Sequence, residues 1–65
     1  MPTIKVTVPK GAWSKDEKGE IAKRLTTALN AVAQDSGKGD IGSFINVHVE
    51  ETAEGGYSVG GKIVG

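Results

Sequence analysis

One segment of the chain, residues 14–36, has the period of an amphipathic helix, and it lies between two segments that alternate as strands do. Its apolar positions form one stripe: Ile21, Leu25, Ala28, Leu29 and Val32. Alternation of apolar and polar residues predicts strands over 3–8 and 44–51. A strand, a helix and a strand in this order predict a right-handed crossover and two parallel strands. The expected fold is therefore an α+β, β-α-β unit.

Local signals set the ends of these segments. Pro9 ends the first strand, because proline cannot donate a hydrogen bond to the ladder. Ser14 begins the helix and forms a capping box with Glu17. Gly37 is the expected left-handed residue that ends the helix. Residues 55–64 predict a turn and a short hairpin, with the last short strand at their end.

The chain is small, and we expect one domain over residues 1–65. A domain of this size buries only about 60% of the surface that its unfolded chain exposes. The sequence has no cysteine, so neither a disulfide nor a thiolate metal site supports the fold. One helix covers only one face of a small sheet, and Trp13, Phe44 and Tyr57 have no obvious core to fill within the chain. We therefore expect an oligomer.

Charge and hydropathy argue against several classes of protein. Eight Lys and Arg residues balance eight Asp and Glu residues, whereas a nucleic-acid-binding domain usually carries a basic stripe. No apolar run approaches the roughly 20 residues of a membrane span, and polar residues interrupt the first strand too early for a signal peptide. We expect no nucleic-acid or membrane partner and a cytoplasmic location. His48 is the only histidine, so no histidine-rich metal site is expected.

Residues 37–42 match the dinucleotide-binding pattern G-x-G-x-x-G, but the context does not suit that function. The pattern acts between a strand and a following helix. Here the expected helix precedes it and the expected strand follows. We therefore interpret these residues as a flexible connection between the two.

Isolated polar side chains leave alternatives open. His48 can act as a general acid or base, although a lone histidine on a strand is more often a solvated residue. Tyr57 either closes a pocket or packs on a neighbour. Glu50 and Glu51 point to opposite faces of a strand, so we interpret them as a charged strand end and not as a catalytic pair. Nothing in the sequence selects among the lysines that can bind an anion: Lys10, Lys38 and Lys62.

The second residue, Pro2, offers the most unusual chemistry in the chain. Removal of Met1 would make Pro2 the amino terminus, with a secondary amine as its nitrogen. The pKa of an α-amino group lies near 8, and an apolar pocket or a nearby cation lowers it, so such an amine can serve as a base. Proline is also ordinary at the start of a strand, and Pro2 alone does not decide the function.

Several segments in a fixed order resemble one known family. Pro2 heads the first strand, and Lys10-Gly11 leads to the serine-capped helix. The second strand ends with residues 47–51, Val-His-Val-Glu-Glu, and an aromatic-x-x-Gly-Gly segment follows at 57–61. Over essentially the whole chain, this arrangement resembles the 4-oxalocrotonate tautomerase family of the tautomerase superfamily.

The resemblance implies a single tautomerase-like domain and an enzyme without metal or organic cofactor. Members of the family are β-α-β protomers that usually form hexamers. A homo-oligomer is therefore implied here, with a hetero-oligomer as the other option. Pro2 would be the catalytic general base. It would move a proton between oxygen and carbon of a small-molecule substrate, an enol or a 2-hydroxy-dienoic acid.

The chain differs from the best-known members of the family at two positions. They have an arginine after the loop glycine, where this chain has Ala12, and a second arginine on the second strand, where it has Asn46. An arginine holds a carboxylate with two parallel hydrogen bonds, which alanine and asparagine cannot do. We therefore expect a neutral or monoanionic enol as substrate. The candidate substrate-binding residues are Asn46, Tyr57, His48 and Trp13.

Two other functions stay open at this point. The same scaffold can host hydratase, decarboxylase or dehalogenase chemistry, in which the substrate or a water is oriented by Asn46 with Tyr57 or His48. Alternatively, the chain is a non-catalytic subunit of a hetero-oligomer, an option that the two missing arginines motivate. Product analysis separates the first from isomerisation, and co-purification tests the second.

Overall fold

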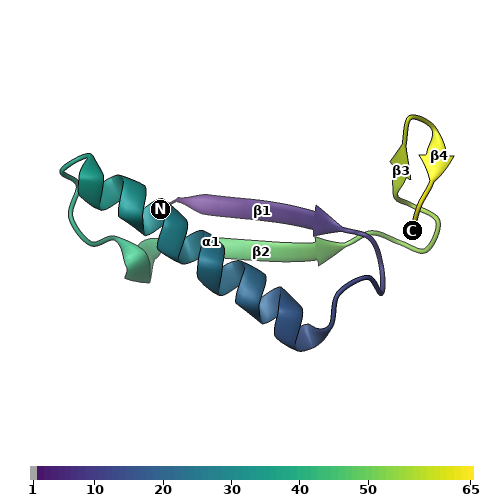
Figure 1. The fold of residues 1–65 in the computed structure, drawn as a ribbon, viewed down its shortest axis with the longest axis horizontal. Helices are drawn as coiled ribbons and strands as arrows, with labels where there is room; N and C mark the ends of the chain where they lie inside the picture. Colours follow the sequence, from purple (N-terminus) through teal and green to yellow (C-terminus); the bar gives the residue numbers. More distant parts are fainter. Residues whose placement is uncertain (1) are drawn as a thin grey trace.

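The computed structural model describes residues 2–65, and it contains one helix, a parallel strand pair and a small hairpin (Figure 1). In chain order the elements are β1 Thr3–Val8, α1 Lys15–Asp35, the 3-10 helix η1 Gly42–Phe44, β2 Asn46–Glu51, β3 Ser58–Val59 and β4 Lys62–Ile63. This arrangement confirms the predicted α+β class with a β-α-β core and a short C-terminal hairpin.

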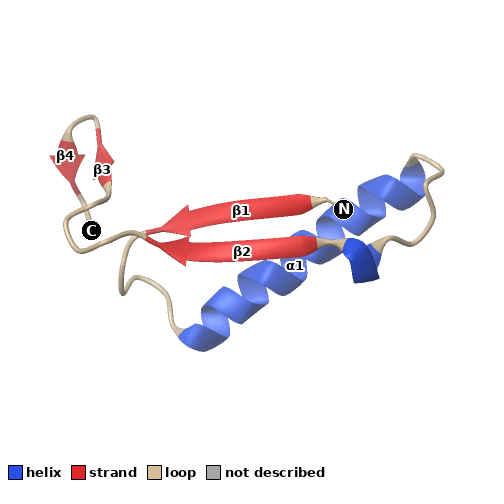
Figure 2. Ribbon diagram, turned by 180° about the vertical axis from the view of Figure 1, so that it is seen from behind, coloured by secondary structure: helices blue, strands red, loops and turns tan. Residues whose placement is uncertain are grey.

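β1 and β2 pair in parallel, from Thr3 opposite Asn46 to Val8 opposite Glu51. The backbone amide of Asn46 also donates to the Pro2 carbonyl oxygen at 2.9 Å, and the backbone amide of Thr52 donates to the Val8 carbonyl oxygen at 3.0 Å. Helix α1 runs obliquely over one side of this pair (Figure 2). The fold is therefore one layer of two strands under one layer of helix.

The prediction that the second strand begins at residue 44 is wrong. Phe44 belongs to η1, whose backbone bends so that the Phe44 amide donates to Ile41 O at 2.9 Å. A strand needs a hydrogen-bonded neighbour, and β1 begins only at Thr3, opposite Asn46. The alternation of apolar and polar residues begins at Phe44, before the point where β1 offers a strand to pair with. The sequence pattern therefore overestimated the length of the second strand.

Both predicted ends of the helix are confirmed in detail. At the start, the Glu17 amide donates to Ser14 Oγ at 3.1 Å and the Ser14 amide donates to Glu17 Oε1 at 2.8 Å, which is a complete capping box. At the end, Gly37 has a φ of 78°. Its amide donates to Gln34 O at 3.1 Å, while the Lys38 amide donates to Ala33 O at 2.9 Å. These two bonds form a Schellman motif, which satisfies carbonyls that the helix leaves unpaired.

The buried stripe of α1 agrees only in part with the prediction. Ile21, Leu25 and Leu29 are half-buried, but Ala28 is exposed and Val32 keeps 59% of its surface exposed. Instead, Ala33 is buried, at 5% exposure. The helix crosses the strands obliquely and η1 also packs on it, so its contact face drifts along its length. A prediction that keeps the buried residues on one fixed face of the helix therefore fails near its C-terminal end.

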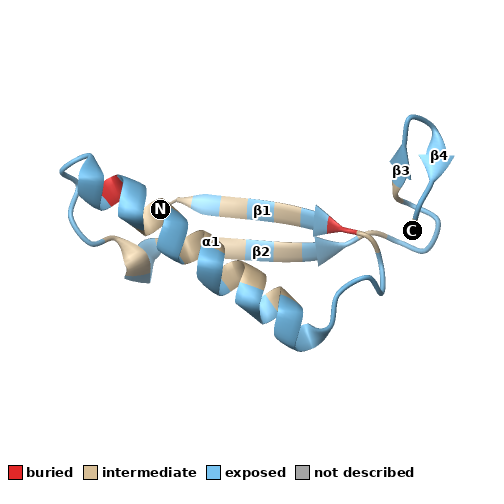
Figure 3. Ribbon diagram, in the orientation of Figure 1, coloured by how far each residue is buried: buried red, intermediate tan, exposed pale blue. Residues whose placement is uncertain are grey.

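The single chain encloses very little core. Among residues 2–65 only Val8 and Ala33 are buried, and most of the ribbon is exposed or half-buried (Figure 3). The hairpin β3–β4 stands apart from the helix, with Val59 63% and Ile63 65% exposed. The radius of gyration is 14.5 Å, whereas a compact chain of this length has about 11 Å. One chain therefore leaves apolar side chains of the helix, of η1 and of the hairpin in contact with solvent.

Within residues 2–65, no helix combines the length and the apolar character that crossing a membrane requires.

We expect the purified protein to be an oligomer, because its exposed apolar side chains need a covering that one chain does not provide. Light scattering coupled to gel filtration should give a mass several times that of one 6.7 kDa chain. Ile63→Asp, which places a charge on an apolar hairpin residue, should shift the mass toward the monomer. A wild-type protein that is a stable monomer would contradict this expectation.

Removal of the helix cap should lower stability measurably. Ser14→Ala removes the Oγ acceptor of the Glu17 amide, and a lost cap of this kind costs about 1 kcal/mol. Urea unfolding at one fixed protein concentration measures the change. Ser43→Ala is the matched control, since Ser43 is an exposed residue inside η1 and is not the residue that caps a helix. Equal stability of the two variants would show that the capping box contributes nothing.

Candidate functional site

Pro2 is held at one end of the parallel strands by the backbone of β2. Its carbonyl oxygen accepts the Asn46 amide at 2.9 Å, and the residue is half-buried. Asn46 is the first residue of β2 and lies opposite Thr3. The structure therefore brings the predicted base and one predicted substrate-binding residue to the same end of the sheet. Met1, whose removal the catalytic role of Pro2 requires, lies outside the described residues.

His48 lies on the sheet face that α1 leaves uncovered. Asn46, His48 and Glu50 are all exposed, while the alternate β2 residues Val47 and Val49 are half-buried beneath the helix. His48 pairs in register with Lys5 of β1. Two residues along a strand span about 7 Å. His48 is therefore near Asn46 on one open polar face, and the two can serve one small ligand.

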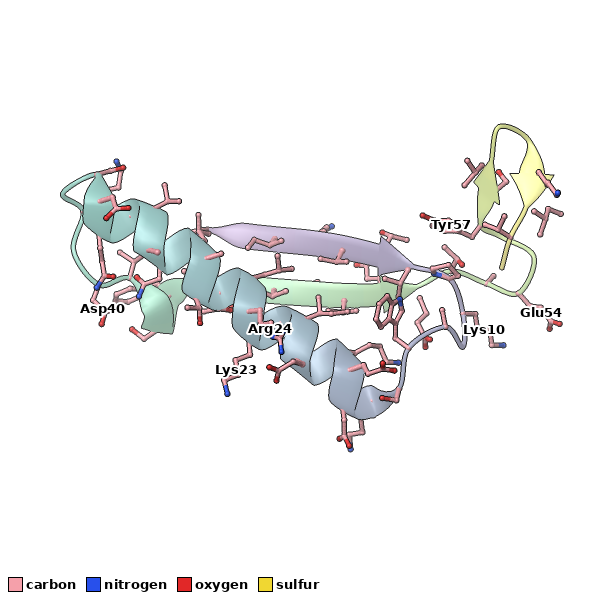
Figure 4. All side chains as sticks on the ribbon, viewed as in Figure 1. Lys10, Lys23, Arg24, Asp40, Glu54 and Tyr57 are labelled. Carbon is pink, nitrogen blue, oxygen red and sulfur yellow. The ribbon has the colours of Figure 1, made fainter. Side chains whose placement is uncertain are left out.

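Trp13 and Tyr57 lie at the other end of the strands. Trp13 follows β1 in the loop to α1, is 43% exposed and directly precedes Ser14. Tyr57 precedes β3, and its carbonyl oxygen accepts the Val64 amide at 2.8 Å at the base of the hairpin (Figure 4). Six strand residues span about 20 Å. One chain therefore does not bring Trp13 or Tyr57 to Pro2. Within residues 2–65, no pocket forms around the candidate base or around any of the four candidate substrate-binding residues.

The chain's single arginine, Arg24, is not part of this arrangement. It lies mid-helix, and its Nε donates to Glu20 Oε1 at 3.0 Å on the exposed surface of α1. It does not replace an arginine at Ala12 or Asn46. No group of three His, Cys, Asp or Glu side chains placed to hold a metal ion occurs in the part of the chain that the structure describes.

Glu51 has a more specific role than the charged strand end that we predicted. One carboxylate oxygen, Oε2, accepts the Gly11 amide at 3.0 Å, and the other, Oε1, lies 3.2 Å from Lys18 Nζ. The hydrogen bond from Gly11 and the one from Lys18 hold the pKa of this carboxyl below its ordinary value. Glu51 thus joins the end of β2 to the β1–α1 loop and to the first turns of the helix.

A signal for this contact was present in the sequence. Glu51 continues the alternate positions of Val47 and Val49, so it lies on the helix-covered face. Lys18 precedes Ile21 by three residues, so it lies on the buried stripe of α1. Two opposite charges, each in the period of an apolar face, predict an ion pair across the layers.

The glycine-rich connection at residues 37–42 is anchored, in contrast to the flexible connection that we expected. The Ile41 amide donates to Asn30 Oδ1 at 2.8 Å, and Asn30 Nδ2 donates to Asp40 Oδ1 at 3.1 Å. The same Asp40 oxygen accepts the Gly42 amide at 3.0 Å. α1 precedes this segment, and η1 and β2 follow it, so its context is not that of a dinucleotide site.

Comparison with known proteins adds no assignment: no family model, curated protein or solved structure matches the chain. The fold and the site define a β-α-β protein of the α+β class, with Pro2 at one end of its sheet and an anchored loop at the other.

Proposed function

We propose that this protein is a cofactor-free tautomerase, an isomerase in which Pro2 acts as general base on a small enol or 2-hydroxy-dienoic acid. The proposal combines the resemblance of the sequence to the 4-oxalocrotonate tautomerase family with one structural observation. The Pro2 carbonyl is bonded to the Asn46 amide at 2.9 Å, so the candidate base is fixed to the sheet. A catalytic group is positioned best on a rigid element of this kind.

The proposed reaction needs one proton carrier. With Met1 removed, the Pro2 nitrogen has a lone pair that takes the proton from the enol hydroxyl, while the O–H electrons form the carbonyl. The same nitrogen then delivers the proton to the substrate carbon, where the electron pair of the enol C=C bond forms the new C–H bond, and the amine returns to its starting state. Asn46 would donate a side-chain hydrogen bond to the substrate oxygen, on which charge develops during the transfer. His48, on the same open face, would assist in orienting the substrate.

A complete site of this kind would form between chains. Trp13 and Tyr57 lie about 20 Å along the strands from Pro2 within one chain, as six strand residues require. In a homo-oligomer, the loop end of one protomer can cover the Pro2 end of another, which would supply both aromatic side chains and exclude water. The proposal therefore includes a homo-oligomer, a hexamer by resemblance, as the active form.

A second candidate function is a non-catalytic subunit of a hetero-oligomer. The observation that favours it is the absence of a cation at Ala12 and Asn46, together with the engagement of the nearby Lys18 by Glu51 at 3.2 Å. Such a subunit would assemble with a chain that carries the missing cations. A pure homo-oligomer that turns over an enol acid would exclude this candidate.

Activity should depend on a free Pro2 nitrogen. Mass spectrometry of protein from its native host should show loss of Met1, and assays with small enol acids such as phenylenolpyruvate should show isomerisation. Pro2→Ala should abolish it. A second form, with one residue added before Pro2 so that its nitrogen becomes an amide, keeps the ring and should also be inactive. Unchanged turnover in either form would refute the role of Pro2 as base.

The charge of the preferred substrate should follow from Asn46. We expect the wild type to act on a monoanionic enol acid in preference to a dicarboxylate of the 2-hydroxymuconate type. Asn46→Arg adds a bidentate carboxylate donor beside Pro2 and should shift the ratio of kcat/KM toward the dicarboxylate. Ala31→Arg, on the exposed part of α1, adds the same charge elsewhere and should leave the ratio unchanged. Equal shifts in both variants would indicate a general effect of charge.

A further inference from the structure

We propose that Glu51 is a charge-dependent latch that fixes the β1–α1 loop, and with it Trp13, at the hairpin end of the sheet. The proposal goes beyond the chemistry at Pro2 and does not depend on it. It rests on two contacts of one carboxylate that join three separate elements of the fold.

The first contact fixes the backbone of the loop. Glu51 Oε2 accepts the Gly11 amide at 3.0 Å, across 40 positions of sequence. Gly11 has a φ of 75°, a conformation that residues with a side chain rarely adopt. The turn is also closed by the Ala12 amide, which donates to Pro9 O at 3.3 Å. Glu51 thus ties a tight turn to the last residue of β2.

The second contact joins the same carboxylate to α1. Lys18 Nζ lies 3.2 Å from Glu51 Oε1, and the two side chains are only 28% and 32% exposed. This partial burial keeps solvent from screening the pair as fully as it screens a surface ion pair. Loss of the carboxylate charge would therefore loosen the loop and the start of the helix together.

Trp13 lies between two anchored points of the backbone. Gly11 precedes it and is bonded to Glu51, and Ser14 follows it and is bonded in the capping box. The side chain is 43% exposed, and it is the only tryptophan in the chain. When the Gly11 anchor is removed, the bond from Ala12 to Pro9 and the helix cap remain, but neither of them ties this segment to β2. Trp13 fluorescence therefore reports directly on the latch.

The pH dependence has a definite sign. The groups that act on Glu51 are the Gly11 amide and Lys10 from the loop and Lys18 from α1, while its register partner on β1 is the uncharged Val8. Each of the three favours the ionised carboxylate, so the pKa of Glu51 is lower in the folded chain than in the unfolded one. The latch is therefore complete above the ordinary glutamate pKa of about 4.3, and it is lost as the pH falls through the lower folded value.

The test is quenching of Trp13 fluorescence by acrylamide as a function of pH in the full-length protein. In the wild type, quenching should be constant from pH 7 down to the ordinary glutamate range and should then rise at lower pH. Glu51→Gln should raise quenching already at pH 7 and should lose the acid-dependent step. Far-UV circular dichroism and light scattering, recorded on the same samples, separate release of the loop from unfolding or dissociation.

Glu50→Gln is the matched control, because it removes the same charge from the adjacent residue on the open face of β2. It should keep the wild-type profile. Lys18→Met leaves the Gly11 hydrogen bond in place and should move the acid step to higher pH without abolishing it. If Glu51→Gln retains the wild-type step while its helix content and mass are unchanged, the latch is refuted. Loss of the acid step in Glu50→Gln to the same extent as in Glu51→Gln would refute it equally, because the step would then follow the general charge of the strand end.

Discussion

The parallel pairing of β1 with β2 is the interaction on which the rest of the structure depends. Parallel strands cannot be joined by a tight turn, so the chain must cross over, and α1 is that crossover. The crossover covers one face of the pair and leaves the other to polar side chains. Pro2 and Asn46 come to one end, while the latch of Glu51 and Gly11 forms at the other. The candidate site and the latch therefore lie at the two ends of the paired strands.

Much of this fold follows from local rules in the sequence. The capping box at Ser14 and the left-handed Gly37 are decided by neighbouring residues, and both were predicted correctly. The start of β2 and the position of Val32 were not, because they depend on where β1 begins and on the oblique path of the helix. Where a strand ends depends on where its neighbouring strand ends, and which helix residues are buried depends on the angle at which the helix crosses the sheet. Neither can be read from the sequence of one segment. The ion pair of Lys18 and Glu51 lies between these cases, since it could be inferred only after both apolar faces were aligned.

The candidate site shows the same division. Its chemistry is local, because a secondary amine at Pro2 depends on one residue and its processing. Its assembly is not, since the aromatic residues Trp13 and Tyr57 lie beyond the far ends of the strands. Within one chain the hairpin keeps its apolar side chains exposed, and the buried core consists of Val8 and Ala33 among residues 2–65, so the homo-oligomer stays part of the proposal. The proposed base could therefore be named from the sequence, whereas the residues that would surround it could not be placed from the sequence.

The register of the sheet also has a kinetic consequence. Thr3 pairs with Asn46, 43 positions further along, and every later pair has the same separation. Closing a loop of that length costs about 3 kcal/mol of chain entropy from the length-dependent part alone. The small core of one chain offsets little of this cost. The capped helix can form early from local contacts, whereas the strands depend on contacts far apart in the sequence. In the homo-oligomer proposed above, folding and assembly should therefore be coupled, with a rate that rises with protein concentration.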